Sequence, residues 1–383
     1  MKICRIAKHL PRVGVTPVEG LHPYFLTALI EEDTLVLTKK YPAQPRPLPS
    51  HAQVVEISYK DIPFSDYMEN ETFVGGKKSI IHKIKFIYRT VSKFREVSFL
   101  FKCMPALLRY RPDIVHCHAF ITILPGIFSK IFLRSKLIVT LHSSVDAVML
   151  KKSRFLRSLL NFADKIFCVS TEIKRELLPF YSENRFEITP NGVDLSLFRN
   201  QSEPRENRLI AVGTFRWYKG YKYLVRAMKI IVEKYPDYTL IICGGGLERQ
   251  QVEDEIRRLS LEQHISITGM ITQEKIAELL NRSRIFVMSS VVEGLPKALI
   301  EALACGTPAV ITTACAAEDA AENTALVVEP KNPAAFADAV SRLISDPQLY
   351  KRLADACPDA VKKYDWRNIA DSVKQIYSSL LSQ

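Results

Sequence analysis

The 383-residue sequence lacks any apolar segment long enough to cross a bilayer. Its longest uncharged runs, 114–129 and 302–317, are shorter than the about 20 residues of a spanning helix, and a proline interrupts each. The amino-terminal MKICRIAKHLPRVG carries charges throughout, so it is not a signal peptide. The eight cysteines form no C-x-x-C pair and no paired spacing, which indicates ordinary core thiols in a reducing cytoplasm.

Low-complexity and disorder-prone tracts are also absent, and hydrophobic residues make up 47% of the chain. The length is typical of two domains. Short β-rich runs such as KICRIA, DIVHCHA, RLIAVGT and IFVMSS alternate with amphipathic helical patterns in both halves. This alternation predicts two α/β units with parallel, doubly wound sheets. We expect the join near 185–207, which is polar and turn-rich, and ligands beyond the carboxyl ends of the strands, in the cleft between the units.

The net charge of +12 is distributed unevenly. Residues 1–195 contain 29 Lys and Arg against 18 Asp and Glu, whereas residues 196–383 contain 24 against 23. A basic half is typical of proteins that meet nucleic acid, an anionic membrane or an anionic substrate, and a solvated surface explains it equally simply. Nucleic acid is the weakest of these interpretations, because aromatic residues do not alternate with the basic ones and no RNA or DNA module is visible.

The stretch SSVVEGLPKALIEALACGTP carries two glutamates eight residues apart, Glu293 and Glu301. Pro296 suits the first position of a helix, which places Glu293 in the preceding loop and Glu301 more than a turn inside. The amides of the first helical turn favour an anion between them. Two carboxylates that accept from hydroxyls, with phosphate between them, suit a nucleotide sugar; two ordinary acidic residues near a helix start would look the same.

The segment EGLPKALIEALACGTPAV closely resembles the signature of the family-four retaining glycosyltransferases. Other segments resemble family motifs in the same order: DKIFCVS, ITPNGVD, GTFRWYKGYKYLVRA, CGGG, ITGMIT and a YDW before the last helix. The resemblance implies the α/β GT-B fold, two Rossmann-like doubly wound parallel-sheet domains facing a central cleft. It implies an acceptor-binding domain over 1–190 and a donor-binding domain over 191–365. Residues 366–383 show an amphipathic helix pattern, and a helix there would be able to pack back on the first domain.

The resemblance assigns donor contacts to several residues. Lys219 matches the phosphate-binding lysine, and a cation there would stabilise the leaving diphosphate. Thr214 stands where the family has arginine, so we expect Arg216 to substitute. Gly245 would let the backbone approach the donor, and Met270 lies where the main chain reads the base. From the signature, the donor site would include Glu293, Gly294, Leu295, Lys297 and Glu301.

The first half supplies the remaining predicted site residues. His142 ends a strand in VTLHSSVD and matches a family histidine near the reacting sugar, so it joins Lys219 and Glu293 as a catalytic candidate. His118 and Gly14 are acceptor-binding candidates, although the loop around Gly14 departs from the family's Gly-Gly pattern. His116 alternates with His118 and is expected to face the sheet interior.

The implied reaction is retaining transfer of a sugar from a nucleotide-diphosphate sugar to an acceptor hydroxyl. No cofactor is expected, and no metal, because the sequence has no Asp-x-Asp and HCH has no third ligand spaced for it. Two other functions remain open: a nucleotide-sugar epimerase on the same fold, and a non-catalytic nucleotide-sugar-binding subunit, which Thr214 leaves possible.

The segment KKSIIHKIKFIYRTVSKFR has helical period, with Lys78, Lys85, Arg89 and Lys93 opposite an apolar face. Together with the basic run 151–157, it predicts peripheral association with an anionic membrane on the cytoplasmic side, where a glycan or lipid-linked acceptor would be met. A core face opposite a solvated face is the plainer interpretation of the same pattern.

Overall fold

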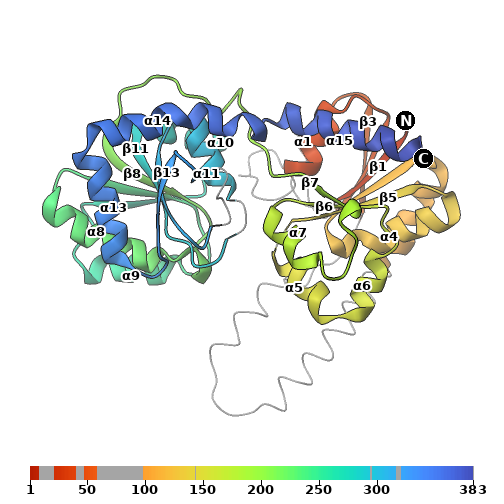
Figure 1. The fold of residues 1–383 in the computed structure, drawn as a ribbon, viewed down its shortest axis with the longest axis horizontal. Helices are drawn as coiled ribbons and strands as arrows, with labels where there is room; N and C mark the ends of the chain where they lie inside the picture. Colours follow the sequence, from red (N-terminus) through yellow and green to blue (C-terminus); the bar gives the residue numbers. More distant parts are fainter. Residues whose placement is uncertain are drawn as a thin grey trace, which may run out of the picture.

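The computed structural model describes residues 1–7, 21–39, 47–57, 98–142, 144–293, 296–315 and 321–382. These residues form two α/β units, each with a parallel sheet between helices (Figure 1). The predicted fold class is therefore confirmed. No helix in this described part of the chain is both long enough and apolar enough to span a bilayer.

The first sheet has the strand order β3-β2-β1-β4-β5-β6-β7, and every pairing in it is parallel. Strands β1 and β4 are buried along their whole length, as expected where helices cover both faces. The sequence does not predict β7, because three residues are too few to show a period. The strands are β1 (Ile3–Ala7), β2 (Thr34–Lys39), β3 (Ala52–Ile57), β4 (Ile114–His118), β5 (Lys136–Leu141), β6 (Lys165–Cys168) and β7 (Phe186–Ile188).

Helices cover the two faces of this sheet with separate apolar clusters. One cluster joins Cys4 and Ile6 to helices that include α5 and α6, and the other joins Ile3 and Phe167 to α1 and α15. Further short turns lie at Phe120–Thr122, Ser129–Leu133 and Glu183–Arg185. The helices of this unit are α1 (Leu21–Leu29), α4 (Ile123–Phe128), α5 (Ser144–Lys152), α6 (Arg154–Leu160) and α7 (Thr171–Leu177); residues 98–110 are also helical.

The second sheet has the order β10-β9-β8-β11-β12-β13 and is again parallel. Helices α8, α9 and α13 bury one of its faces and α10 and α11 bury the other, while α14 contributes Leu349 and Leu353 to the first cluster and Cys357 and Val361 to the second. Its strands are β8 (Glu206–Val212), β9 (Thr239–Cys243), β10 (Ile265–Gly269), β11 (Ser283–Met288), β12 (Ala309–Thr312) and β13 (Ala325–Val328). Its helices are α8 (Tyr221–Lys234), α9 (Arg249–Arg258), α10 (Gln273–Arg282), α11 (Lys297–Ala304), α13 (Pro333–Ser345) and α14 (Pro347–Val361).

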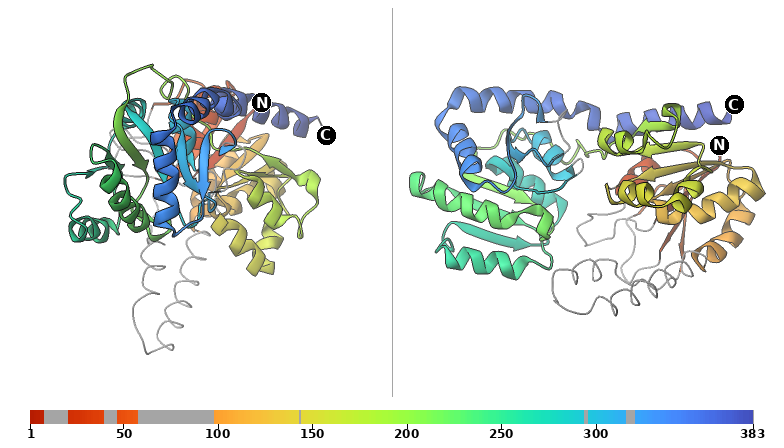
Figure 2. Two further views of the ribbon diagram at one scale, coloured as in Figure 1. Left: turned by 60° about the vertical axis from the view of Figure 1, so that its left-hand side comes forward. Right: turned by 60° about the horizontal axis from the view of Figure 1, so that its bottom comes forward.

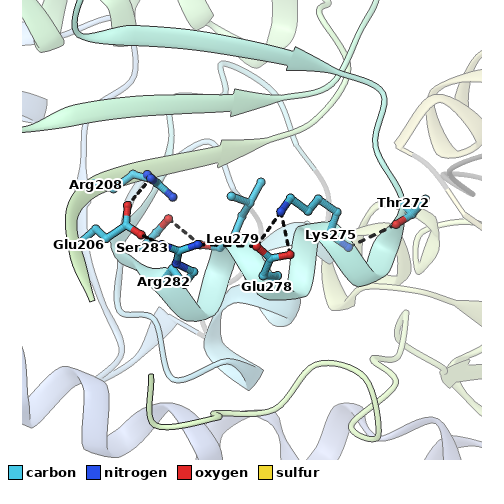
Figure 3. Close-up of polar contacts among 8 residues, drawn as sticks. All are labelled: Glu206, Arg208, Thr272, Lys275, Glu278, Leu279, Arg282 and Ser283. Atoms are coloured by element: carbon cyan, nitrogen blue, oxygen red, sulfur yellow. Dashed lines mark hydrogen bonds and ion pairs between the residues drawn. The ribbon is translucent and has the colours of Figure 1, made fainter. Parts of the chain in front are cut away.

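Polar contacts fix helix α10 along its length (Figure 3). Thr272 caps its amino terminus by accepting from the Lys275 amide at 3.3 Å. At the other end Arg282 pairs with Glu206 at the start of β8, and the Ser283 hydroxyl donates to the Leu279 carbonyl at 2.7 Å. The helix therefore enters β11 at a fixed register beside β8, and the far ends of these two strands carry the site described below.

Arg205 holds the carboxyl ends of α10 and α11 together. Its guanidinium donates to the carbonyls of Leu280, Ser283, Cys305 and Gly306 and to the Thr307 hydroxyl, at 2.7 to 3.1 Å. A cation is favourable there because the carbonyls that end a helix carry partial negative charge. The sequence shows only a polar linker at this position.

Helix α15 (Trp366–Leu381) follows α14 but packs on the first unit. It lies beside α1, and the chain ends on the unit where it began (Figures 1 and 2). Trp366 stacks on Phe25 with ring centroids 5.0 Å apart, and Val373 and Tyr377 are fully buried. One polypeptide thus crosses twice between the units, near Val193 and near Asp365, where the two crossings pair with each other.

Candidate active site

Two loops lie side by side where β8 and β9 end. The Gly213 amide donates to the Cys243 carbonyl and the Phe215 amide to the Gly245 carbonyl, both at 2.9 Å. Gly244 has a φ of +153°, and a Cβ there would lie 1.9 Å from the Gly213 carbonyl oxygen. The glycine run of the sequence is therefore explained in part by this close approach of two backbones.

The turn after this loop carries Lys219. The turn spans Trp217–Lys219 and ends at Gly220, which has a φ of +66°. The Ser289 hydroxyl donates to the Lys219 carbonyl at 3.0 Å, and the Val291 amide donates to the Tyr218 carbonyl at 2.6 Å. These bonds attach the turn to the segment that follows β11.

Lys219 forms an ion pair with Glu293, which lies on the segment after β11. The side chains are 15% and 18% exposed, so the pair is largely withdrawn from water but still reachable. The Ser290 hydroxyl also donates to the Glu293 carboxylate, at 3.4 Å. A small cavity beside Lys219 is lined by the ends of β8 and β11. The structure thus brings together two residues that are 74 positions apart and that the sequence assigned to one site.

Helix α11 carries the second carboxylate of the signature. Glu301 is 5% exposed, and its carboxylate lies 3.4 Å from the Lys297 ammonium one turn earlier. Burial raises the pKa of Glu301, and the Lys297 charge partly opposes that shift. The helix begins at Lys297, one residue later than predicted, because Pro296 has an extended ψ of 112° and serves as the N-cap.

Replacing Glu301 by glutamine is expected to stabilise the ligand-free protein by about 1 kcal/mol at pH 7. The folded-state pKa lies above the ordinary value of 4.5, so the native carboxylate opposes folding once the pH rises through the window above 4.5. The gain should vanish below that window, where the carboxyl group is protonated in both states. Urea unfolding at several pH values measures the effect.

The exposed Glu278→Gln is the matched control, since Glu278 pairs with Lys275 at the surface of α10. It should change the free energy of unfolding by only a few tenths of a kcal/mol. A Glu301→Gln protein that is less stable than the control at pH 7 contradicts the prediction.

Gly245 and Met270 also lie together. A Cβ on Gly245 would contact the Met270 Cγ at 3.4 Å, which is an ordinary contact distance. Met270 is 53% exposed and follows the end of β10. Because parallel strands end at one edge, the loops after β8, β9, β10 and β11 share the carboxyl edge of the second sheet. Arg216 lies at the same edge, and its carbonyl accepts from the Lys219 amide at 2.9 Å.

The histidines lie at the carboxyl edge of the first sheet. His118 is the last residue of β4, and His142 follows β5; their rings are 6.1 Å apart and stacked. Burial lowers the pKa of His142 to about 4, so its imidazole is neutral at physiological pH. His116 is fully buried, as predicted, but its ring stacks on that of His118 at 4.0 Å, so the two side chains share one face and the expected alternation between them is wrong.

Several predicted positions lie outside the described residues. These are Gly14 in the first loop, Gly294 and Leu295 in the signature, and Lys78, Lys85, Arg89 and Lys93 in the basic segment. Their roles stay predictions. The sequence missed Ser290, which bonds to Glu293, and its position three residues before a signature glutamate is the only available signal.

The chain is similar in sequence to known glycosyltransferases over most of its length. The family model described as "Glycosyl transferases group 1" matches residues 194–358, and the one described as "Glycosyltransferase Family 4" matches residues 65–197. An uncharacterized glycosyltransferase of Methanocaldococcus jannaschii is 28% identical over 336 residues, covering 85% of this chain and 91% of the relative.

Solved structures show the same fold. Sucrose-phosphate synthase of Thermosynechococcus elongatus superposes with a TM-score of 0.81 at 20% identity, covering 100% of this chain and 99% of its own. Anabaena HepE in complex with UDP-glucose superposes with a TM-score of 0.74 at 16% identity, covering 99% of this chain and 100% of its own. The two-sheet architecture of this chain is thus shared with both solved structures.

Proposed function

Since the chain belongs to the group 1 glycosyltransferases, we propose that it moves a sugar from a nucleotide-diphosphate sugar to an acceptor hydroxyl with retention of configuration. The observation that carries the proposal is the Lys219–Glu293 pair at the carboxyl edge of the second sheet. Anabaena HepE, which shares the fold, was solved in complex with UDP-glucose, and this supports a nucleotide-sugar donor.

Each site residue has a role that follows from its chemistry. The Lys219 ammonium stabilises the charge that develops on the leaving diphosphate. Glu293 is its partner in the ligand-free protein, so the arriving phosphate would replace one carboxylate oxygen and leave Glu293 available to a sugar hydroxyl. Glu301 accepts from ribose hydroxyls, and the nearby Lys297 ammonium favours its ionised form. Neutral His142, at the edge of the first sheet, bonds to the sugar or the acceptor without adding charge.

The proposal is tested by incubating the protein with nucleotide sugars and candidate acceptors, with and without EDTA, and following product by NMR. Transfer with the anomeric configuration of the donor, unchanged by EDTA, is the expected result. Inversion would refute retention, and loss of activity in EDTA would refute metal independence. Epimerised donor without transfer would favour an epimerase. A donor that raises the melting temperature without any turnover would favour a non-catalytic binding subunit.

We further propose that the acceptor is met at an anionic membrane. Helix α6 and most of α5 lie in a stretch, 147–163, that contains no acidic residue, and Asp146 lies in the first turn of α5. Its Lys152 and Arg154 are exposed, and Phe155 beside them is 61% exposed. Cations around an exposed aromatic ring suit the boundary between anionic headgroups and acyl chains. Lys151 is partly neutralised by Glu176, at 3.9 Å.

Replacing Lys152 and Arg154 by alanine is expected to weaken binding to phosphatidylglycerol-containing vesicles about thirtyfold. Each basic residue near such a surface contributes about 1 kcal/mol. Co-sedimentation measures the partition. The control replaces Lys351 of α14 and Lys362, which directly follows that helix, and so changes the net charge equally on the other unit. Equal losses in both double variants would show a general charge effect and contradict the assignment of this surface.

A further inference from the structure

A row of polar side chains lies buried beneath helix α15. Arg5 of β1 pairs in register with His116 of β4, and both are fully buried. Alternation along the strand places His118 on the same face as His116. That face belongs to the apolar cluster that contains Ile3, Ile114 and residues of α15. The proposed sugar transfer does not involve the buried Arg5 cation or the buried His116 imidazole beside it.

His116 has a partner at each ring nitrogen. Its Nδ1 lies 2.5 Å from the Tyr377 hydroxyl of α15, and its Nε2 lies 2.6 Å from the Thr140 hydroxyl of β5. A neutral imidazole donates through one nitrogen and accepts through the other. The two bonds alone allow either tautomer.

Arg5 decides between the tautomers. Its guanidinium donates to the hydroxyls of Thr27 and Thr34 at 3.3 and 3.2 Å. Arg5 is also the cross-strand neighbour of His116, so its positive charge acts on the Tyr377 hydroxyl oxygen that bonds to the same ring. The phenol oxygen therefore turns its lone pairs toward Arg5 and its O–H toward the His116 Nδ1. It follows that Nδ1 accepts and Nε2 carries the proton, which it donates to Thr140.

The same arrangement opposes protonation of His116. A second ring proton on Nδ1 would displace the Tyr377 donor and would place a positive charge beside the Arg5 cation. The other titratable group that stacks on this ring is His118 of the same strand, and Phe167 of β6 meets the ring edge at 5.2 Å.

The row continues to the carboxyl edge of the sheet. The His116 and His118 rings stack at 4.0 Å, and the His118 and His142 rings at 6.1 Å. The ring planes of neighbouring histidines are within 28° of parallel. The orientation of the buried His116 ring therefore influences the orientation of the His118 and His142 rings at the site. A helix on the back of the sheet is thus connected to the predicted catalytic histidine through side chains in contact.

We propose that Arg5 and Tyr377 are positioning residues that keep His116 neutral with its proton on Nε2, and thereby keep His118 and His142 oriented at the site. The part that concerns His142 rests on the proposed sugar transfer, whereas the tautomer of His116 does not.

Tyr377→Phe tests the proposal, with Tyr181→Phe as the matched control. Tyr181 is also buried, and its hydroxyl donates to the Arg157 carbonyl at 3.1 Å, away from the histidines. In ¹⁵N spectra of histidine-labelled protein, the wild type should show His116 as the Nε2–H tautomer. Tyr377→Phe should show mixed tautomers and bind a proton about tenfold more tightly, which moves the acidic limb of the activity profile up by roughly one pH unit.

A second pair of variants separates charge from packing. Arg5→Met should move the limb in the same direction, and Arg5→Lys, which keeps the buried charge, should restore it. An unchanged His116 tautomer in Tyr377→Phe, or a limb shifted equally in Tyr181→Phe, overturns the proposal. If the wild type transfers no sugar, the proposed function fails, and the nitrogen spectra still decide the tautomer.

Discussion

Replacing Lys219 by methionine is expected to lower kcat/KM for sugar transfer about a thousandfold. Removal of a single preorganised group that stabilises developing charge costs roughly 10²–10³ in rate, and Lys219 carries a full charge in a largely enclosed position. Steady-state kinetics with the donor that supports turnover measure the loss. Lys222→Met is the matched control, because Lys222 is three residues further along and exposed on α8.

The double variant Lys219→Met/Glu293→Gln separates stability from catalysis. Lys219→Met leaves the Glu293 carboxylate partly buried without its partner, which destabilises the loop. Adding Glu293→Gln removes that charge, so the double variant should regain stability but not activity. A Lys219→Met enzyme that keeps a tenth of its activity, or a double variant that recovers it, would exclude Lys219 as the group that stabilises the leaving diphosphate.

Two adjacent glycines are expected to respond to alanine in opposite ways. Gly244→Ala should destabilise the second unit by about 3 kcal/mol or more, because its Cβ would lie 1.9 Å from the Gly213 carbonyl oxygen at a φ of +153°. This corresponds to a fall in melting temperature of roughly 6–12 °C. Differential scanning calorimetry measures the change.

Gly245→Ala should leave the free energy of unfolding within about 0.5 kcal/mol of the wild type. Its Cβ would meet only the flexible Met270 side chain, at 3.4 Å. Its donor affinity should nevertheless fall at least tenfold, because the methyl group would stand where the backbone approaches the nucleotide. If Gly245→Ala is as unstable as Gly244→Ala, the fold alone requires both glycines, and the argument for a donor contact at Gly245 is lost.

The sequence predicts the fold well because the central strands are buried and form short apolar runs. The run KICRIA at residues 2–7, for example, is found as β1 at Ile3–Ala7, buried along its whole length. What it could not predict are contacts between distant residues whose partners are backbone groups or ring nitrogens. Arg205 binds carbonyls that lie 75 to 101 positions away, and Tyr377 lies 261 positions from His116. No local period records such pairs.

In the site, too, features set by local sequence could be predicted and features set by tertiary contacts could not. The Lys219–Glu293 pair could be anticipated because each residue lies in its own short motif after a strand. The start of α11 was missed by one residue because the ψ of Pro296, and not its fixed φ, decides whether it is helical. Tertiary structure also decides which glycine of the run 244–246 serves the fold and which leaves space.

Helix α15 belongs to the first unit but follows the second unit along the chain. The first unit is therefore formed by two separate segments of the sequence. A fragment that stops before the second sheet would contain β1 to β7, but α1 alone would cover Ile3, Ile114 and Phe167, with the Arg5 cation beside them. Such a fragment would expose an apolar stripe with a charge inside it, and aggregation is its expected fate. Engineering that isolates or exchanges this unit must therefore carry residues 366–382 with it, either fused through a short loop or supplied as a separate helix.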